Sequence, residues 1–198
     1  MMKRILLAGL LGGFALFVWE FVAHDLTPLG TAGMGRLDQE DTIRAYFKQN
    51  IPNPGLYYFP APDFAPGLSS AQRQEAMTKA AELARTGPTG MLLVQGAREM
   101  ITPRQLITQF VLDALSMLVA AFLLARLPAT SFLNRLLFVT SLAFLPGLRT
   151  LIPMWNWYGF PAAYTVAQIA IDVVGFFAAG LILAKMVQIR SNTMAAAS

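Results

Sequence analysis

The segment LITQFVLDALSMLVAAFLLA, residues Leu106–Ala125, holds a single charged side chain, Asp113. A transmembrane helix needs roughly twenty mostly apolar residues, so this segment is long enough to cross a bilayer. A carboxyl group inside hydrocarbon is costly and usually faces the protein interior, next to a partner group. The segment therefore predicts a membrane-spanning helix that turns Asp113 toward other helices.

Three more runs of similar length are as apolar as this one, and 56% of the 198 residues are hydrophobic whereas 13% are charged. The runs are Ile5–Ala23, Leu136–Trp155 and Ala162–Ala184. We expect an all-α membrane protein, a four-helix transmembrane bundle with helices over 1–24, 105–126, 136–155 and 162–185. Lys3-Arg4 before an apolar run is also typical of a signal peptide. That run exceeds the usual length of about 7–15 residues, so a retained helix is the preferred interpretation.

Basic residues near the ends of the apolar runs predict the orientation of the chain. Six of them have no acidic residue nearby: Lys3, Arg4, Arg126, Arg135, Lys185 and Arg190. Because Lys and Arg favour the cytoplasmic side, both termini and the tail 186–198 are expected in the cytoplasm. Residues 25–104, with eight basic and eight acidic side chains, are then extracytoplasmic. The net charge is +4, and the basic residues are distributed along the expected membrane edges. We therefore expect the lipid bilayer, and no nucleic acid, as a partner.

The loop 25–104 is too long for a simple connector, and its pattern predicts a small α+β cap inserted between helices 1 and 2. Thr102-Pro103 is a good helix start and begins the second span. The other expected elements are a helix over Asp38–Gln49, a strand over Leu56–Phe59, a helix capped by Ser70 that reaches Arg85, and a strand over Met91–Val94. The two strands are expected to pair over the helices.

Spans two and four align at an offset of 59 residues, which places Gln109 on Gln168 and Asp113 on Asp172. This pattern favours two helical hairpins that repeat in tandem, and functional sites often lie where such copies meet. Chance similarity between apolar helices is the alternative interpretation.

Several polar side chains fall in the expected outer half of the membrane. At 1.5 Å per residue, the charged ones lie within about 15 Å of the outer boundary. They are Glu20, Asp113, Asp172 and Arg149, with Gln109 and Gln168 as neutral hydrogen-bond donors. Arg149 follows Pro146-Gly147, where a helix can kink, and is expected to pair with Asp113 or Asp172. This polar membrane cluster suits cation binding or a proton relay, or else a structural network between helices.

The outer loop between spans three and four is dense in aromatic residues, with Trp155, Trp157, Tyr158 and Phe160. An interfacial belt explains them, and a docking surface is the alternative. His24 lies one turn from Glu20 but lacks further ligands, so no metal site and no cofactor are expected. The chain has no cysteine, which excludes disulfides and thiolate catalysis. No nucleophile, phosphate-loop or nucleotide motif occurs, so we expect no catalytic residue and no enzyme.

The chain resembles a family of small uncharacterised bacterial integral membrane proteins with four spans. The matching residues are Lys3–Leu7, Gly12-Gly13, Pro52, Pro54–Tyr57, Phe59-Pro60, Gly87–Gly90, Pro103–Leu106 and Trp157–Pro161. The resemblance implies a shared fold and a bacterial inner membrane, and it implies no activity.

Two functions from different classes follow from these patterns. The first is a non-enzymatic accessory protein that contacts another membrane or envelope protein through the cap or the aromatic loop. The second is a small transporter, proton relay or cation-binding protein that uses the carboxylate/Arg cluster. Four spans enclose little volume, so a conduction path favours a homo-oligomer.

Overall fold

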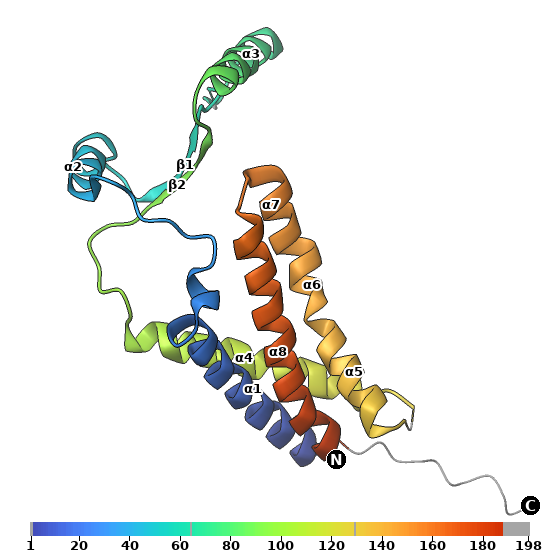
Figure 1. Ribbon diagram of the computed structural model, residues 1–198. Coiled ribbons are helices and arrows are strands. Elements are labelled where there is room, and N and C mark those ends of the chain that lie inside the picture. Colours follow the sequence, from blue (N-terminus) through green and yellow to red (C-terminus); the bar gives the residue numbers. More distant parts are fainter. Residues whose placement is uncertain (1, 64, 129, 188–198) are drawn as a thin grey trace, which may run out of the picture. The chain divides into compact units, whose positions relative to one another are not determined.

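The fold is described from a computed structural model, which describes residues 2–63, 65–128 and 130–187. The chain divides into two compact units, shown in Figure 1. Residues 1–34 and 101–198 contribute to the first, here called the helical unit. Residues 35–100 form the second, here called the inserted unit.

The helical unit contains four helices that are long and apolar enough to cross a membrane. They are α1 (Met2–Asp25), α4 (Pro103–Leu124), the combined helix α5–α7 (Phe132–Tyr158) and α8 (Ala162–Met186). The four helices expected from the sequence are thereby confirmed to within a few residues at each end. Their length and composition indicate a multi-pass membrane protein.

The third of these helices changes its winding near the middle. It consists of α5 (Phe132–Leu142), α6 (Phe144–Pro146), η2 (Gly147–Leu151) and α7 (Ile152–Tyr158), of which η2 is a π-helix. Pro146 lacks the amide hydrogen that a regular turn requires. The loosening expected at Pro146-Gly147 is therefore realised as a wide turn that begins at Gly147.

α1 and α4 pack antiparallel in a regular register. Gly9 faces Leu118, and Gly13 lies against the main chain of Ala114. One turn of α1 beyond Gly13, the rings of Phe17 and Phe110 meet edge to face with centroids 5.9 Å apart. The two glycines allow this approach because a Cβ at Gly13 would collide with the backbone of Ala114.

α8 packs against both α1 and the combined helix α5–α7, so it lies between them (Figure 1). Gly180 receives Leu136 and Val139, and Gly12 receives Leu183. The core is therefore built from large apolar side chains that pack into the space left by small residues on the facing helix. Its largest fully buried side chains are Met117, Leu124, Ile171, Leu183 and Val139.

The segment after α1 belongs to the helical unit, although the sequence assigned residues from 25 onward to the cap. Thr27 caps the short 3-10 helix η1 (Pro28–Thr31), and Gly30 packs against His24. Gly33, with a positive φ of 74°, lies close to the main chain of Tyr164 at the start of α8. The end of α1 and the beginning of α8 are thus on the same side of the unit.

The inserted unit contains α2 (Glu40–Asn50), β1 (Gly55–Phe59), α3 (Ser70–Thr86) and β2 (Gly90–Val94). β1 and β2 pair antiparallel, with Gly55 opposite Val94 and Phe59 opposite Gly90. All four expected elements are present. α2 has no buried residue and α3 buries only Ala80, so neither helix has a substantial core.

Helix caps explain where two of the helices begin. The Thr102 hydroxyl accepts from Gln105 N at 3.3 Å, so Thr102 caps α4 as the sequence predicted. Gln105 Oε1 in turn accepts from Thr102 N at 2.8 Å, which completes a capping box. α3 has the same arrangement between Ser69 and Gln72. The prediction of Ser70 as the cap was wrong by one residue, because only Ser69 has a Gln three positions later.

Candidate functional site

The polar cluster of the helical unit is organised by the side-chain amide of Gln109. Its nitrogen donates one hydrogen bond to Glu20 Oε2 at 2.8 Å and another to Asp113 Oδ1 at 2.9 Å. Gln109 and Asp113 are one turn apart on α4, and Glu20 comes from the facing side of α1. The antiparallel packing of α1 and α4 thus brings together a carboxylate from each helix.

Asp113 is the most enclosed member, with 4% of its surface exposed. Its second oxygen, Oδ2, is buried and has no hydrogen-bond partner among the described residues. A buried carboxylate oxygen without a donor is costly, so this atom requires a proton, a cation or a bound water.

Trp19 connects α8 to the same region. Its indole nitrogen donates to the main-chain oxygen of Ile171 at 2.8 Å, and the ring lies where Gly175 leaves room for it. Asp172, the next residue of α8, is half-buried and lies within electrostatic range of Glu20 and His24. Three helices therefore contribute one carboxylate each to this part of the unit.

Gln168 and Asp172 do not repeat the bonding of Gln109 and Asp113. Gln168 is half-buried, and its side chain forms no hydrogen bond within the described residues. The neutral bridge is therefore found on α4 and not on α8.

Arg149 lies apart from the carboxylates. The expected pair with Asp113 or Asp172 does not form, and the described residues contain one salt bridge, Arg36–Glu40. Gly147 occupies the inward side of the π-helix, against Ile169, whereas Arg149 lies two residues further on and is exposed. Two residues correspond to roughly half a turn, which directs Arg149 away from α8.

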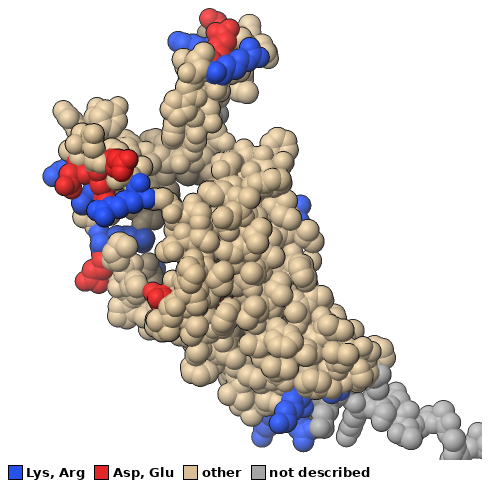
Figure 2. All heavy atoms as spheres, in the orientation of Figure 1, with Lys and Arg blue, Asp and Glu red and all other residues tan. Residues whose placement is uncertain are grey.

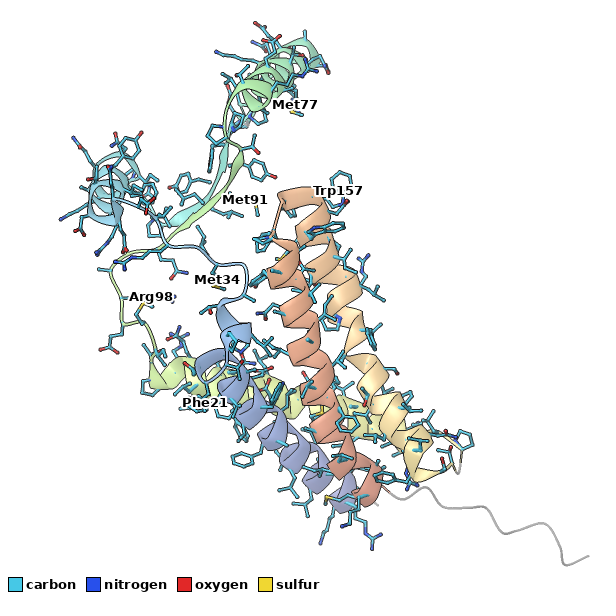
Figure 3. The ribbon with its side chains drawn as sticks, viewed as in Figure 1. Phe21, Met34, Met77, Met91, Arg98 and Trp157 are labelled. Carbon is cyan, nitrogen blue, oxygen red and sulfur yellow. The ribbon has the colours of Figure 1, made fainter. Side chains whose placement is uncertain are left out.

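The aromatic residues of the outer loop are mostly on the surface. Trp155 and Tyr158 are exposed, and Trp157 is 75% exposed at the end of α7 (Figure 3). Phe160 is the exception, because its ring lies 5.6 Å from that of Tyr164. The loop is thus packed against α8 at Phe160, whereas its earlier aromatic residues are exposed.

Among the described residues, no group of three or more His, Asp or Glu side chains is arranged to hold a metal ion. His24 is exposed, and its Nδ1 donates to the main-chain oxygen of Glu20 at 2.9 Å. That bond fixes the ring against its own helix.

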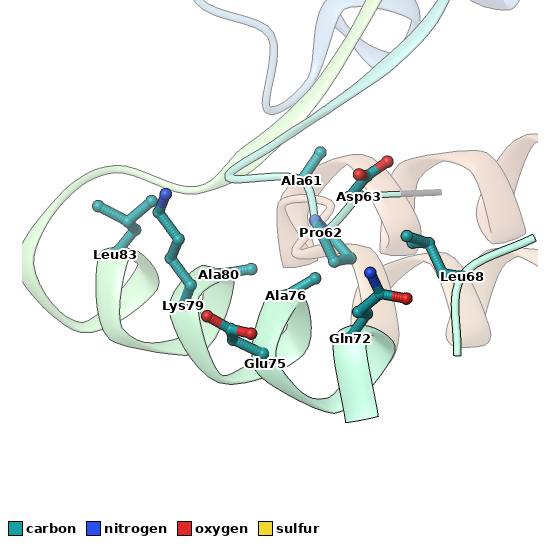
Figure 4. A pocket seen from close by; sticks show the side chains of 10 residues that line it. All are labelled: Ala61, Pro62, Asp63, Leu68, Gln72, Glu75, Ala76, Lys79, Ala80 and Leu83. Carbon is teal, nitrogen blue, oxygen red and sulfur yellow. The ribbon is translucent and has the colours of Figure 1, made fainter. Parts of the chain in front are cut away.

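A hollow of about 480 Å³ lies in the inserted unit, at a place that the sequence did not predict. It is formed between α3 and the segment after β1, as Figure 4 shows. Ala76 and Ala80 form its floor, with Lys79, Glu75 and Asp63 around it. Asp63 is already engaged by the amide of Ala65 at 2.8 Å, and the mixed charges define no particular ligand.

Comparison with protein families, curated proteins and solved structures finds no match to this chain. What the site can do therefore rests on its own chemistry. An amide that bridges two carboxylates can hold two helices together, and the open Oδ2 of Asp113 can take up a proton or a cation.

Proposed function

We propose that this chain is a multi-pass protein of the bacterial inner membrane that acts as a non-enzymatic accessory protein. Its inserted unit faces the extracytoplasmic side and binds another envelope protein. The observation that carries the proposal is the two-stranded ribbon of β1 and β2, which is apolar on both faces and is not covered by the helices of its own unit.

The two faces of the ribbon follow from its register. Leu56 pairs with Leu93 on one face, and each of these side chains is 65% exposed. Tyr57 pairs with Leu92 on the other face. A two-stranded ribbon alone is marginally stable in water, and exposed apolar patches commonly mark interaction sites. A bound partner would supply the missing cover.

The free edge of β2 suggests how the partner binds. β1 is flanked by Pro54 and Pro60, which obstruct the pairing of a further strand. β2 (Gly90–Val94) contains neither a proline nor a charged residue, and these are two common means of protecting a strand edge from pairing. An extended segment of the partner can add there through main-chain hydrogen bonds.

The test is a native pull-down of the tagged full-length chain from its own membranes in mild detergent. We expect a stoichiometric envelope protein to copurify, and the double substitution Leu56→Ser with Leu93→Ser to reduce its yield at least tenfold. Met77→Ser is the matched control, because Met77 is exposed on α3 of the same unit (Figure 3). Equal capture by both variants, or capture of no partner, contradicts the proposal.

The proposed orientation has its own support and its own test. Figure 2 shows Lys and Arg side chains gathered at the end of the helical unit where α1 begins, with no Asp or Glu beside them on that face. A reporter fused after Ser198 should be active in the cytoplasm, and one inserted at Gly67 should be active outside. The opposite pattern overturns the orientation.

A second candidate function is proton or cation binding at the polar cluster, favoured by the unpartnered buried Oδ2 of Asp113. Asp113→Asn keeps the shape of the side chain and removes its ability to hold a proton or an ion. In liposomes, the unaltered chain should then support a proton or cation flux that this variant loses. Flux that is equal in both, or absent from both, excludes this function.

We also propose that the two hairpins are structural repeats. Spans one and three share a weaker similarity, because Arg4-Ile-Leu-Leu resembles Arg135-Leu-Leu-Phe. Together with the offset of 59 residues between α4 and α8, this alignment places Gly147 at the position of Leu16 and Ile169 at that of Phe110. Gly147 does lie against Ile169, one residue in register from the Phe17–Phe110 contact of the first hairpin. This agreement supports the repeat, although the Gln109 bridge has no counterpart in the second hairpin.

A further inference from the structure

The helical unit carries basic and acidic side chains that form no ion pair among the described residues, although charged groups within a membrane usually have one. Arg149 is exposed on the combined helix α5–α7 and forms no ion pair among the described residues. Glu20, Asp113 and Asp172 form none either, and Gln109 is the only side chain within the described residues that hydrogen-bonds their carboxylates. One chain thus carries an unmatched cation and an unmatched group of anions.

Arg149 does not reach the Glu20–Gln109–Asp113 cluster of its own chain. α8 packs on α1 on one side and on α5–α7 on the other (Figure 1). It therefore lies between the helix that carries Glu20 and the helix that carries Arg149. A charged side chain on a lipid-facing surface is costly, and such groups usually have a partner of opposite charge. A group of opposite charge on a neighbouring molecule would offset much of this cost.

Glu20 and Arg149 also lie at similar depths in the membrane, so that Arg149 of one molecule can contact Glu20 of another. At 1.5 Å per residue, Glu20 lies about 8 Å from the end of α1, and Arg149 about 14 Å from the end of α7. These ends are on the same side of the unit, because Gly33 packs against Tyr164 at the start of α8. Membrane proteins associate laterally, so groups at similar depth come together, and the long Arg side chain spans the remaining difference.

We propose that a second copy of this chain places its Arg149 against the Glu20–Gln109–Asp113 cluster. Glu20 is half-buried and Gln109 is exposed, so the cluster can be reached from the surface of the unit. Each copy carries both halves of the contact. The copies therefore form either a two-fold dimer with reciprocal contacts or a closed ring. This inference concerns the helical unit and is independent of the partner proposed for the inserted unit.

Because the chain has no cysteine, single cysteines can be introduced without background. Phe21 and Thr150 are exposed neighbours of Glu20 and Arg149, so Phe21→Cys and Thr150→Cys report on the contact while keeping the charges. The two variants, with different tags, are produced together in native membranes and oxidised. We expect a disulfide between the two differently tagged chains.

The charge is then tested in the same background. Arg149→Gln should lower the cross-linked fraction about tenfold, and Arg149→Lys should retain most of it. Val119→Cys, exposed on α4 further from the cluster, replaces Phe21→Cys as the control that should not cross-link with Thr150→Cys. Circular dichroism and gel filtration establish that each variant is folded.

Three outcomes overturn the proposal. The first is no cross-link between Phe21→Cys and Thr150→Cys chains that are otherwise folded. The second is a cross-link that persists unchanged in Arg149→Gln, which assigns the contact to other residues. The third is a monomer in vesicles containing phosphatidylglycerol, in which case the Arg149 side chain is matched by lipid phosphate.

Discussion

The indole nitrogen of Trp19 donates a hydrogen bond to the main-chain oxygen of Ile171, which is 2.8 Å away on α8. The next residue of α1, Glu20, accepts a hydrogen bond from Gln109 on α4. Two consecutive residues of α1 therefore hold two different helices, since neighbours on a helix point about 100° apart. This short stretch is the junction of the helical unit.

Trp19→Phe should weaken that junction. A smaller aromatic ring remains, but the carbonyl of Ile171 loses its indole donor, and we expect this lost hydrogen bond to lower the free energy of unfolding by roughly 0.5–1.5 kcal/mol. Denaturant unfolding in detergent micelles measures it. Trp157→Phe is the matched control, because that ring is 75% exposed and should change stability little. Equal effects at the two positions contradict the assigned role of Trp19.

Gly13→Ala should be more damaging than its size suggests. The added Cβ would collide with the main chain of Ala114, so α1 and α4 must move apart. Overpacking of this kind costs about 1–3 kcal/mol, measurable by the same unfolding experiment. Gly35→Ala provides the control, since a Cβ there meets nothing within 4 Å. A Gly13→Ala variant as stable as the unaltered chain refutes this close approach.

Gln109→Leu should destabilise the helical unit more than Gln168→Leu. The first removes the donor to both Glu20 and Asp113, and leaving such groups unsatisfied costs roughly 1–3 kcal/mol. The second removes a side chain without a hydrogen bond among the described residues. Thermal unfolding of the two variants side by side gives the comparison. A larger loss of stability in Gln168→Leu than in Gln109→Leu would contradict the bridging role of Gln109.

The cap of α3 can be tested at neighbouring serines. Ser69→Ala removes the oxygen that accepts from Gln72 N at 3.3 Å, which should cost about 1 kcal/mol at the start of the helix. Hydrogen exchange of the first-turn amides should then accelerate about fivefold. Ser70→Ala should leave exchange nearly unchanged, because Ser70 lies inside the helix. Acceleration in Ser70→Ala alone would restore Ser70 as the cap.

Much of this fold could be predicted from local patterns. The four apolar helices follow from length and hydropathy, and the start of α4 follows from Thr102-Pro103. The strands β1 and β2 were recognised from Pro and Gly at their ends. Each of these features depends on residues close together in the chain, which a sequence displays directly.

The features that escaped prediction depend on packing between distant segments. The pairing of Arg149 was mispredicted because its direction depends on the winding of η2, which periodicity at 3.6 residues does not follow. The link from Trp19 to Ile171 joins residues 152 positions apart and carries no sequence signal beyond a tryptophan. The different roles of Gln109 and Gln168 arise for the same reason, since their local sequences are alike.

The π-helix at Gly147–Leu151 divides its span into two parts, and the direction of the second part can change while the first keeps its packing. The part before it packs on α8 through Leu136 and Val139, and the part after it carries Trp155 and Tyr158. Deletion of one residue within the wide turn would restore regular winding and rotate the outer part by about 100°. The buried half would keep its contacts while the aromatic end faced a new direction. Mutation could thus redirect this surface toward a different neighbour without redesign of the core.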